Sequence, residues 1–496
     1  MAREGAVARQ QHGTTLADNQ PRTSESTGGT SAEPPTRPRP AALILVLTGS
    51  FMTALDVFIV NVAIPSMTGD LRAGPAAIQW VVAGYALAIA AGLITGGRLG
   101  DIYGRRRMYA VAMALFTLAS VACGLAPTVE VLVTARVVQG LAAALLGPQV
   151  LAIINTAYAG RARAGALNAY GVTLGLAAVF GQLIGGLLIE ADLMGLGWRN
   201  IFLINLPIGL VAVSLIPRVV PELAPTRRAR LDLVGAVLVT TALLGTMLPL
   251  IQGREQGWPG WTWLCLAASG VLFVAFAWHQ RLRGRRHRAP LVDLHLFRSR
   301  SFVTGLLAQL AFWLGQASFF LVLALYLQAG RGLSALESGV FFTGLGAGYL
   351  AASLLARRLA ARLGRQVIAL GAALMIAGEF WMLVDVRRSV EIGWLLPPMA
   401  VHAAGMGLVI APLVAIALSG VAPGHAGAAS GVLSTAQQIG NGLGVAIIGV
   451  FFYSAPPGDH ALAFSLALAY LMAVGAAVVG LAQLLPRPAA DARRQG

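Results

Sequence analysis

The chain has 496 residues, of which 57% are hydrophobic and 11% charged, and its mean hydropathy is +0.73. A soluble protein carries about 25% charged residues, so this composition argues against a soluble domain. The charge is also one-sided, because 36 basic residues, all of them arginine, stand against 20 acidic ones and give a net charge of +16. In a soluble chain such a charge would indicate nucleic-acid binding. The apolar content instead makes the lipid bilayer the expected partner, with no nucleic acid.

The two cysteines, Cys123 and Cys265, both lie inside apolar runs and have no CxxC or Cys/His partner. They argue against a disulfide framework and a zinc site, and we expect neither a metal nor a cofactor. Residues 1–40 are rich in Ser, Thr, Pro, Gly and Gln without a hydrophobic stretch, so we expect a disordered tail there. The first apolar segment begins near Ala41, too late and too long for a signal peptide, and we expect it to be retained.

Apolar segments dominate the rest of the chain, and each offers the roughly 20 residues that a membrane-spanning helix needs. Their joints are faintest around 251–261 and 453–461, where Pro and Gly interrupt them. We count fourteen expected spans, at 41–64, 76–97, 107–126, 131–156, 165–189, 200–218, 231–251, 261–280, 301–327, 335–356, 366–386, 392–417, 427–453 and 461–485.

The distribution of arginine predicts the orientation. With the N-terminus placed in the cytoplasm, 28 arginines fall in cytoplasmic segments, six in outer loops, and Arg98 and Arg136 within or at the edge of spans. This bias satisfies the positive-inside rule with both termini cytoplasmic. An even number of spans also requires both ends to lie on one side.

The longest arginine-rich cytoplasmic run, from Arg281 to Arg300, follows the eighth span. If a twelve-helix transporter consists of two six-helix halves, the seventh and eighth spans form an extra hairpin between them. We therefore predict a cytoplasmic tail at 1–40, a six-helix bundle at 41–219, a linker with two extra spans at 220–300, a second bundle at 301–485 and a cytoplasmic tail at 486–496.

The most specific motif lies at 97–107 and reads GRLGDIYGRRR. It resembles the signature of the loop between the second and third spans in the major facilitator superfamily. The resemblance implies that this region latches the two halves together on the cytoplasmic side. The residues to which it assigns that role are Gly97, Gly100, Asp101, Gly104 and Arg105, while Ile102 stands where the family often has a basic residue.

Further stretches are similar to the fourteen-span drug:proton antiporters of the EmrB/QacA type. Leu55-Asp56 with the run at 61–65 resembles the first-span signature, and the runs at 79–82, 198–209, 290–297 and 430–441 match other parts of that family. The matches extend from about residue 50 to residue 450. They imply an all-α integral membrane protein with the major facilitator fold, made of two six-helix bundles plus an inserted two-helix hairpin.

The segment at 165–189 resembles the glycine motif associated with exporters. Its glycines are Gly171, Gly175, Gly181, Gly185 and Gly186, and Gln182 replaces the motif proline, so the bend that proline imposes need not form. Glycines at four-residue spacing permit close helix packing. The alternative is that they serve generic packing only.

Two acidic residues fall within the expected hydrocarbon region, Asp56 and Glu379. An aspartate at mid-membrane costs about 2.5–3.5 kcal/mol on insertion scales, so both are candidates for proton coupling. Arg136, followed by Gln139-Gly140, matches the R-x-x-Q-G motif of the family. Arg136 either extends toward the outer surface or stays buried and stabilises a nearby carboxylate. Structural hydrogen bonding remains the alternative role for the two acids.

Polar and aromatic side chains on two other segments predict a substrate cavity, because helical spacing places the members of each set on one face. Interhelical hydrogen bonding is the alternative role for them. The candidates are Gln309, Trp313, Gln316 and Phe320 in one segment, and Ser434, Gln438 and Asn441 in the other.

The sequence therefore predicts a proton-coupled exporter of drug-like molecules in the cell membrane, acting as a monomer by alternating access. An enzyme is not expected, because the seven histidines are dispersed, the HExxH and GxSxG motifs are missing, and a phosphate-binding loop cannot form without lysine. An importer, or an exporter of one specific metabolite, on the same fold remains an alternative.

Overall fold

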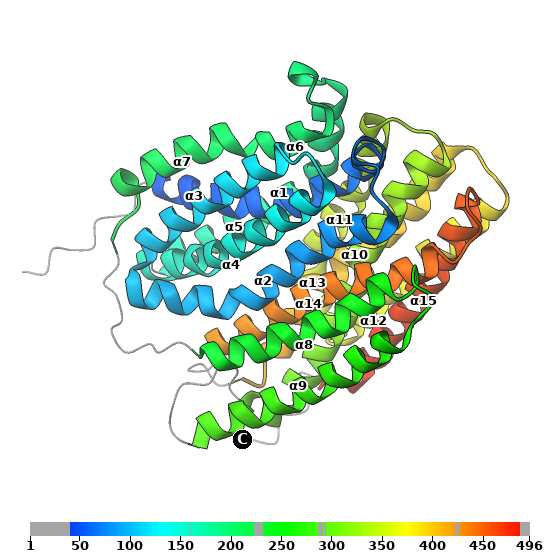
Figure 1. Ribbon diagram of the computed structural model, residues 1–496. Helices are drawn as coiled ribbons and strands as arrows, with labels where there is room; N and C mark the ends of the chain where they lie inside the picture. The colour runs from blue at the N-terminus through cyan, green and yellow to red at the C-terminus, as the bar shows by residue number, and fades with distance from the viewer. Residues whose placement is uncertain are drawn as a thin grey trace, which may run out of the picture. The chain divides into compact units, whose positions relative to one another are not determined.

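The computed structural model describes residues 40–158, 160–222, 232–285, 291, 294–421 and 426–486. Most of the tail predicted at 1–40 and of the tail at 486–496 lies outside the described residues. Within the described residues, regular structure is entirely helical (Figure 1). The helices are α1 (Pro40–Leu71), α2 (Pro75–Tyr103), α3 (Arg105–Gly124), α4 (Val129–Ala157), α5 (Gly160–Glu190), α6 (Asn200–Leu203), α7 (Asn205–Val219), α8 (Leu233–Gln252), α9 (Gly260–Arg285), α10 (Arg300–Leu325), α11 (Ala335–Leu363), α12 (Gln366–Arg387), α13 (Leu396–Leu418), α14 (Ala426–Phe452) and α15 (His460–Leu484).

The structure has thirteen to fourteen candidate spans, which agrees with the fourteen predicted. Thirteen segments of the described chain are long and apolar enough to cross a bilayer, one of which joins α6 and α7 as Gly197–Val219. The fourteenth is α5 when its two parts, Arg161–Ala178 and Phe180–Glu190, which are bent by 43°, are counted as one span.

The spans form two bundles with an inserted hairpin, as predicted. In the first bundle α1 packs on α5, while α2 and α3 pack on α4; in the second, α10 packs on α14, and α11 and α12 pack on α13. The bundles meet where α5 packs on α11 and α2 packs on α14. Helices α8 and α9 pack on each other, and α8 also packs on α2 and α14, so the hairpin covers one of the two seams between the bundles.

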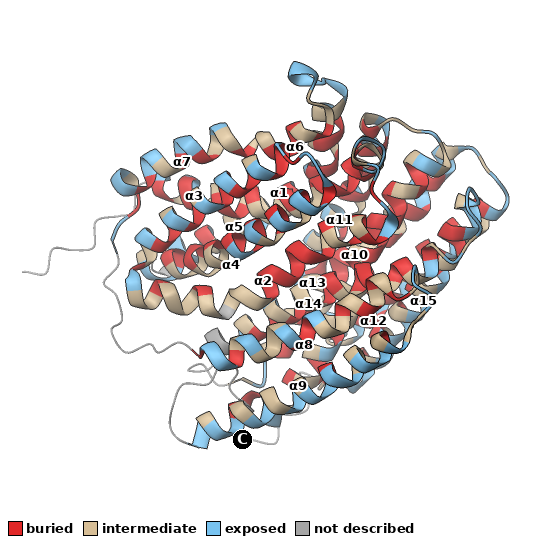
Figure 2. Cartoon of the chain, viewed as in Figure 1, coloured by how far each residue is buried: buried red, intermediate tan, exposed pale blue. Residues whose placement is uncertain are grey.

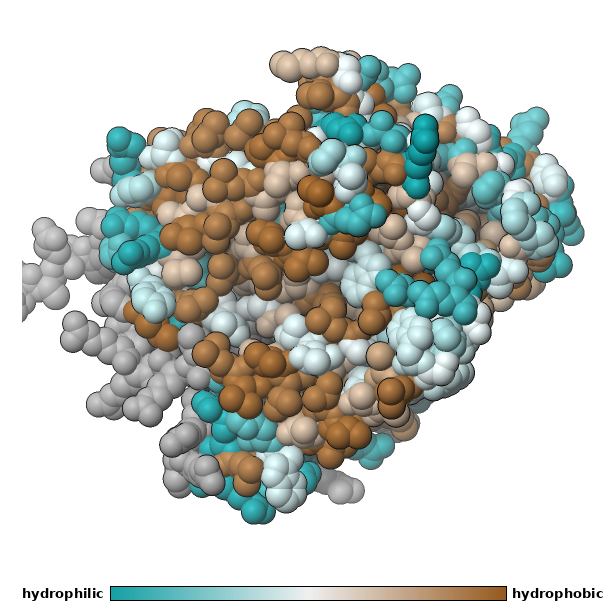
Figure 3. Space-filling model, in the orientation of Figure 1, coloured by the Kyte–Doolittle hydropathy of each residue, from teal (hydrophilic) through white to brown (hydrophobic). Residues whose placement is uncertain are grey.

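The two ends of the bundles differ in charge. We call the end that carries Arg105–Arg107 and Arg357–Arg365 the arginine-rich end, and the end that carries Arg72, Arg199 and Arg331 the arginine-poor end. Figure 3 shows hydrophobic side chains over the middle of the visible face and hydrophilic groups toward its ends. This distribution suits a protein with an apolar belt in lipid.

Of the two hairpin helices, α9 is the less buried, and Figure 2 shows mainly intermediate and exposed residues along it. Trp263, Leu264, Val274 and Trp278 are each more than 60% exposed. Because large apolar side chains on a helix of this length avoid water, this face is the one that lipid solvates.

At the arginine-rich end, Asp232 joins the two hairpin helices. Its carboxylate caps the N-terminus of α8 by accepting a hydrogen bond from the N–H of Gly235 at 3.0 Å, and it contacts His279 and Gln280 of α9 at 2.9 Å each. Burial raises the pKa of Asp232, but these hydrogen bonds and the charge of Arg283 outweigh burial and hold the pKa below its usual value. Asp232 is therefore an ionised structural residue and not a proton carrier near neutral pH.

Candidate functional site

A buried ion pair joins α1 to α4. Asp56 lies in the middle of α1 with its side chain 0% exposed, and its Oδ2 accepts a hydrogen bond from Nη1 of Arg136, whose side chain is 1% exposed. The other carboxylate oxygen, Oδ1, accepts a hydrogen bond from Nε2 of Gln139 at 2.9 Å. Two charges removed from water are tolerated only when they pair and their remaining polar atoms are satisfied. This arrangement meets that condition.

Arg136 has further partners that hold its guanidinium. Its Nε donates to the carbonyl oxygen of Val81 at 3.1 Å, and Nη1 also donates to Oε1 of Gln139 at 2.8 Å. The guanidinium carbon lies 4.0 Å from the centroid of the Tyr85 ring, a cation–π contact. The sequence left open whether Arg136 extends toward the outer surface or stays buried beside a carboxylate. In the structure its guanidinium is buried next to the carboxylate of Asp56.

The network continues into α3 and the helices after it. Nε2 of Gln139 also donates to Oγ of Ser120 at 3.2 Å, and Ser120 accepts from Nδ2 of Asn205 at 2.8 Å. Ser120 in turn donates to the carbonyl oxygen of Phe202 at 2.9 Å. Six helices of the first bundle thus contribute groups to the network around one ion pair, namely α1, α2, α3, α4, α6 and α7.

A second buried acidic residue, Glu379 in α12, lies in the other bundle. Glu379 is 2% exposed, and its Oε1 is 3.3 Å from Nδ1 of His402 in α13. The side chain of His402 is itself fully buried. The ring of Phe319 stacks on His402 with the ring centroids 3.9 Å apart. His402 was not among the predicted site residues. Its position inside the apolar span at 392–417 is the signal that could have indicated it.

A cavity that opens on one side lies between the two bundles and is lined by side chains from both. Arg136 is on its wall, so the ion pair and the cavity share one side chain. The second bundle contributes predicted residues to it. The lining residues are Val57, Phe58, Asn61, Val82, Tyr85, Ala86, Arg136, Trp313, Gln316, Ala317, Phe320, Gln438 and Asn441.

Two of the predicted cavity residues lie elsewhere. Gln309 is 4% exposed and does not line the cavity, and Ser434 is an exposed residue outside it. Gln309 precedes Gln316 by seven residues, or about 10 Å of helix rise. The two side chains therefore lie on the same face of α10 but at different positions along its axis, and only Gln316 is level with the cavity. Asn61 and Tyr85 line the cavity but were read from the sequence only as parts of family signatures.

The loop between α2 and α3 keeps its contacts inside the first bundle. Asp101 pairs with Arg105, and Nη1 of Arg105 donates to Oε1 of Gln149 in α4 at 3.4 Å. Gly97 packs near Pro148, and a Cβ at Gly100 would clash with the side chain of Gln149. Gly104 has a φ of +91°, a conformation that favours glycine. The latch between bundles that the resemblance implies stays a prediction.

The five motif glycines of α5 fall into two groups. A Cβ added at Gly181 or Gly185 would come within 3 Å of α1 side chains, and one added at Gly186 would lie 2.4 Å from the carbonyl oxygen of Ala335 in α11. A Cβ added at Gly171 would meet no atom within 4 Å, and one at Gly175 would meet only Tyr349, at 4.0 Å. Hence α5 touches its neighbours closely toward the arginine-poor end and loosely toward the arginine-rich end.

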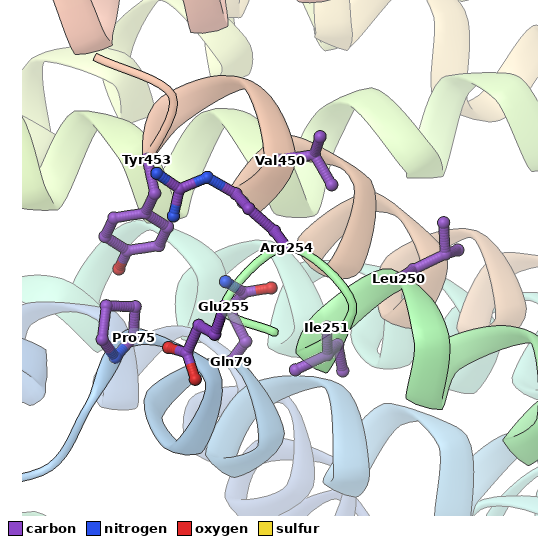
Figure 4. A pocket seen from close by; sticks show the side chains of 9 residues that line it. Pro75, Gln79, Leu250, Ile251, Arg254, Glu255, Val450 and Tyr453 are labelled. Atoms are coloured by element: carbon purple, nitrogen blue, oxygen red, sulfur yellow. The ribbon is translucent and has the colours of Figure 1, made fainter. Parts of the chain in front are cut away.

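The hairpin loop reaches both bundles at the arginine-poor end (Figure 4). Oε1 of Glu255 accepts a hydrogen bond from the N–H of Ala76 in the first turn of α2, at 3.0 Å. The guanidinium of Arg254 lies 6.0 Å from the ring centroid of Tyr453, which directly follows α14. Both residues line a small pocket with Gln79 of α2. The seam between α2 and α14 is therefore covered by α8 and, at this end, also bridged by Arg254 and Glu255 of the hairpin loop.

Membrane-spanning bundles, a cavity between them and buried ionisable groups beside that cavity define a multi-span membrane transporter. The chain belongs to the Major Facilitator Superfamily, whose sequence profile matches residues 46–445. It is a transporter and not an enzyme. Among solved structures it is similar to the inward-open conformation of the xylose transporter XylE from E. coli, with a TM-score of 0.62 at 16% identity, covering 91% of this chain and 97% of that one.

The chain is also similar to named bacterial proteins. It is 39% identical to the "Probable actinorhodin transporter" of Streptomyces coelicolor, covering 86% of this chain and 74% of that protein. It is 36% identical to the "Cephamycin export protein CmcT" of Amycolatopsis lactamdurans, covering 82% and 84%. It is 37% identical to the "Puromycin resistance protein pur8" of Streptomyces alboniger, covering 82% and 80%.

Separating the two partners of the ion pair should reveal strong coupling between them. We expect Asp56→Ala and Arg136→Ala each to destabilise the protein by about 3–5 kcal/mol, because each leaves one buried charge unpaired. The double variant should lose much less than the sum. Thermal unfolding in detergent measures all three. The exposed pair Asp70–Arg199 is the control and should show coupling of about 1 kcal/mol or less; additive losses at the buried pair would contradict the assignment.

Two glycines on one helix should respond differently to the same substitution. Gly186→Ala forces α5 away from the backbone of α11 and should cost roughly 1–3 kcal/mol by overpacking. Gly171→Ala meets open space and should be neutral or stabilise by up to about 1 kcal/mol through helix propensity. Unfolding temperatures of the two variants test this, and equal losses would refute the close contact at Gly186.

Proposed function

We propose that the chain is a proton-coupled exporter of drug-like compounds, taking one or more protons in as a compound leaves. The observation that carries this proposal is that Arg136 belongs at once to the buried ion pair and to the cavity wall. Relatives named for antibiotic export and resistance support the direction of transport. The antiporter-type glycines of α5 support it as well.

Asp56 is the proposed proton carrier. Ionised, it neutralises Arg136; protonated, it leaves an uncompensated guanidinium on the cavity wall. An unpaired buried charge binds water strongly, and that water competes with an apolar compound for the cavity. Proton binding and compound binding therefore oppose each other, as exchange of one for the other requires. Each proton entering across 100 mV releases about 2.3 kcal/mol.

Glu379 is a second proton-coupling candidate, with His402 as its partner. Because neither residue lines the cavity, their protonation would act through the packing of α12 on α13 rather than by contact with the compound. Structural pairing is the alternative role.

In the membrane, the arginine-rich end is proposed to face the cytoplasm, with both termini on that side, and the protein is proposed to act as a monomer. The bundles, which correspond to 41–219 and 301–485, would rock about the cavity in alternating access. In a state that is closed at the arginine-rich end, we expect α5 around Gly171 to pack closely on α11, and the loop carrying Asp101 and Arg105 to contact the second bundle. Uptake instead of export would show as accumulation of the compound in expressing cells.

Asp56→Asn should abolish gradient-driven export while the protein remains folded and inserted. Asparagine keeps the shape of the side chain and its hydrogen bond with Gln139, but it does not bind a proton. The assay is compound uptake into inside-out vesicles energised with a proton gradient, with an uncoupler expected to stop uptake by the unsubstituted protein.

The matched control is Asp70→Asn, which removes an exposed aspartate from the same helix and the same kind of Arg pair. It should retain uptake. The proposal would be contradicted if Asp56→Asn took up the compound as fast as the unsubstituted protein does, or if uptake by the unsubstituted protein resisted the uncoupler.

A further inference from the structure

We infer that the cavity selects uncharged, planar aromatic compounds that carry both a hydrogen-bond donor and an acceptor, and that it rejects permanent cations. The inference rests on the proposed export function, because it concerns the ligand of the same cavity.

The charge of the lining argues against cations. Arg136 is the one charged side chain among the lining residues that the structure describes, and it is positive. Its counter-ion, Asp56, is 0% exposed and is absent from the wall, with both carboxylate oxygens already bonded to Arg136 and Gln139. A cation entering this cavity would lose its water without gaining a carboxylate, which is unfavourable.

Aromatic rings shape the wall. Phe58 of α1 meets Phe320 of α10 edge to face, with centroids 5.3 Å apart, and Phe320 also stacks on Phe342. Trp313 lies on the same helix as Phe320 and also lines the cavity. Rings held in this way present flat apolar surfaces and ring edges, which favour a planar aromatic ligand over a flexible aliphatic one.

Two polar atoms that belong to lining side chains have no hydrogen-bond partner within the described part of the chain. They are the donor Nε1 of Trp313 and the acceptor Oε1 of Gln316, and both are buried. Gln316 as a whole is only 1% exposed. Buried polar groups are normally satisfied, so a ligand that offers an acceptor to Trp313 and a donor to Gln316 completes the site.

The test uses three compounds that share one ring system and purified full-length protein in nanodiscs. Radiolabelled 2-aminoanthraquinone is uncharged with a donor and acceptors, anthraquinone lacks the donor, and 2-(trimethylammonio)anthraquinone is a permanent cation. Empty nanodiscs correct for partition into lipid. We expect 2-aminoanthraquinone to bind about tenfold more tightly than either of the other two, because each lacks or blocks one contact.

Gln316→Leu removes the acceptor and should weaken 2-aminoanthraquinone binding about tenfold while leaving anthraquinone unchanged. Gln309→Leu is the matched control, since it removes the same buried side chain from the same helix outside the cavity, and it should change neither affinity. Gln316→Glu places a carboxylate on the wall and should raise the affinity for the cation to at least that of 2-aminoanthraquinone.

The cation binding the unsubstituted protein as tightly as 2-aminoanthraquinone would overturn the inference. So would equal effects of the two leucine substitutions, or no binding of any of the three compounds. None of these results touches the proposed export function, which fails instead if vesicle uptake does not depend on Asp56 and on the proton gradient. Ligand ranking in the unsubstituted protein decides the question even where a variant does not fold.

Discussion

The constraint on which the first bundle depends is the burial of an aspartate and an arginine in the middle of a membrane. The side chains of Asp56 and Arg136 are 0% and 1% exposed, so each must be satisfied mainly by protein groups. That requirement draws the backbone of α2, the side chain of Gln139 and the ring of Tyr85 to one point. The helices of the first bundle are thus arranged so that both charges are compensated.

The two bundles contribute different chemistry to the space between them. The first supplies the charged pair, whereas the second supplies amide and aromatic side chains such as Gln438 and Trp313. The buried acid of the second bundle, Glu379, stays with His402 away from the cavity. A compound in the cavity consequently meets ionic chemistry on one side only, where Arg136 is the charged group that it can contact.

Much of the fold could be predicted from the sequence because lipid imposes length and polarity on every span. Asp56 and Arg136 could be singled out for the same reason, since charge in a span is costly. Their pairing could not be derived, because they are 80 residues apart and no local spacing relates helices that pack only in three dimensions. The same limit separates Gln316, which lines the cavity, from Gln309, which has the same helical face at another depth.

The hairpin makes the two sides of the protein unequal toward lipid. Because α8 lies against both α2 and α14, and its loop holds Ala76 through Glu255, the bilayer has no direct route to the cavity along that seam. Within the described residues the hairpin does not pack on the seam between α5 and α11, whose looser half lies near Gly171. A compound dissolved in the membrane would therefore meet an asymmetric protein, with one seam behind the hairpin and the other in direct contact with lipid over its described residues.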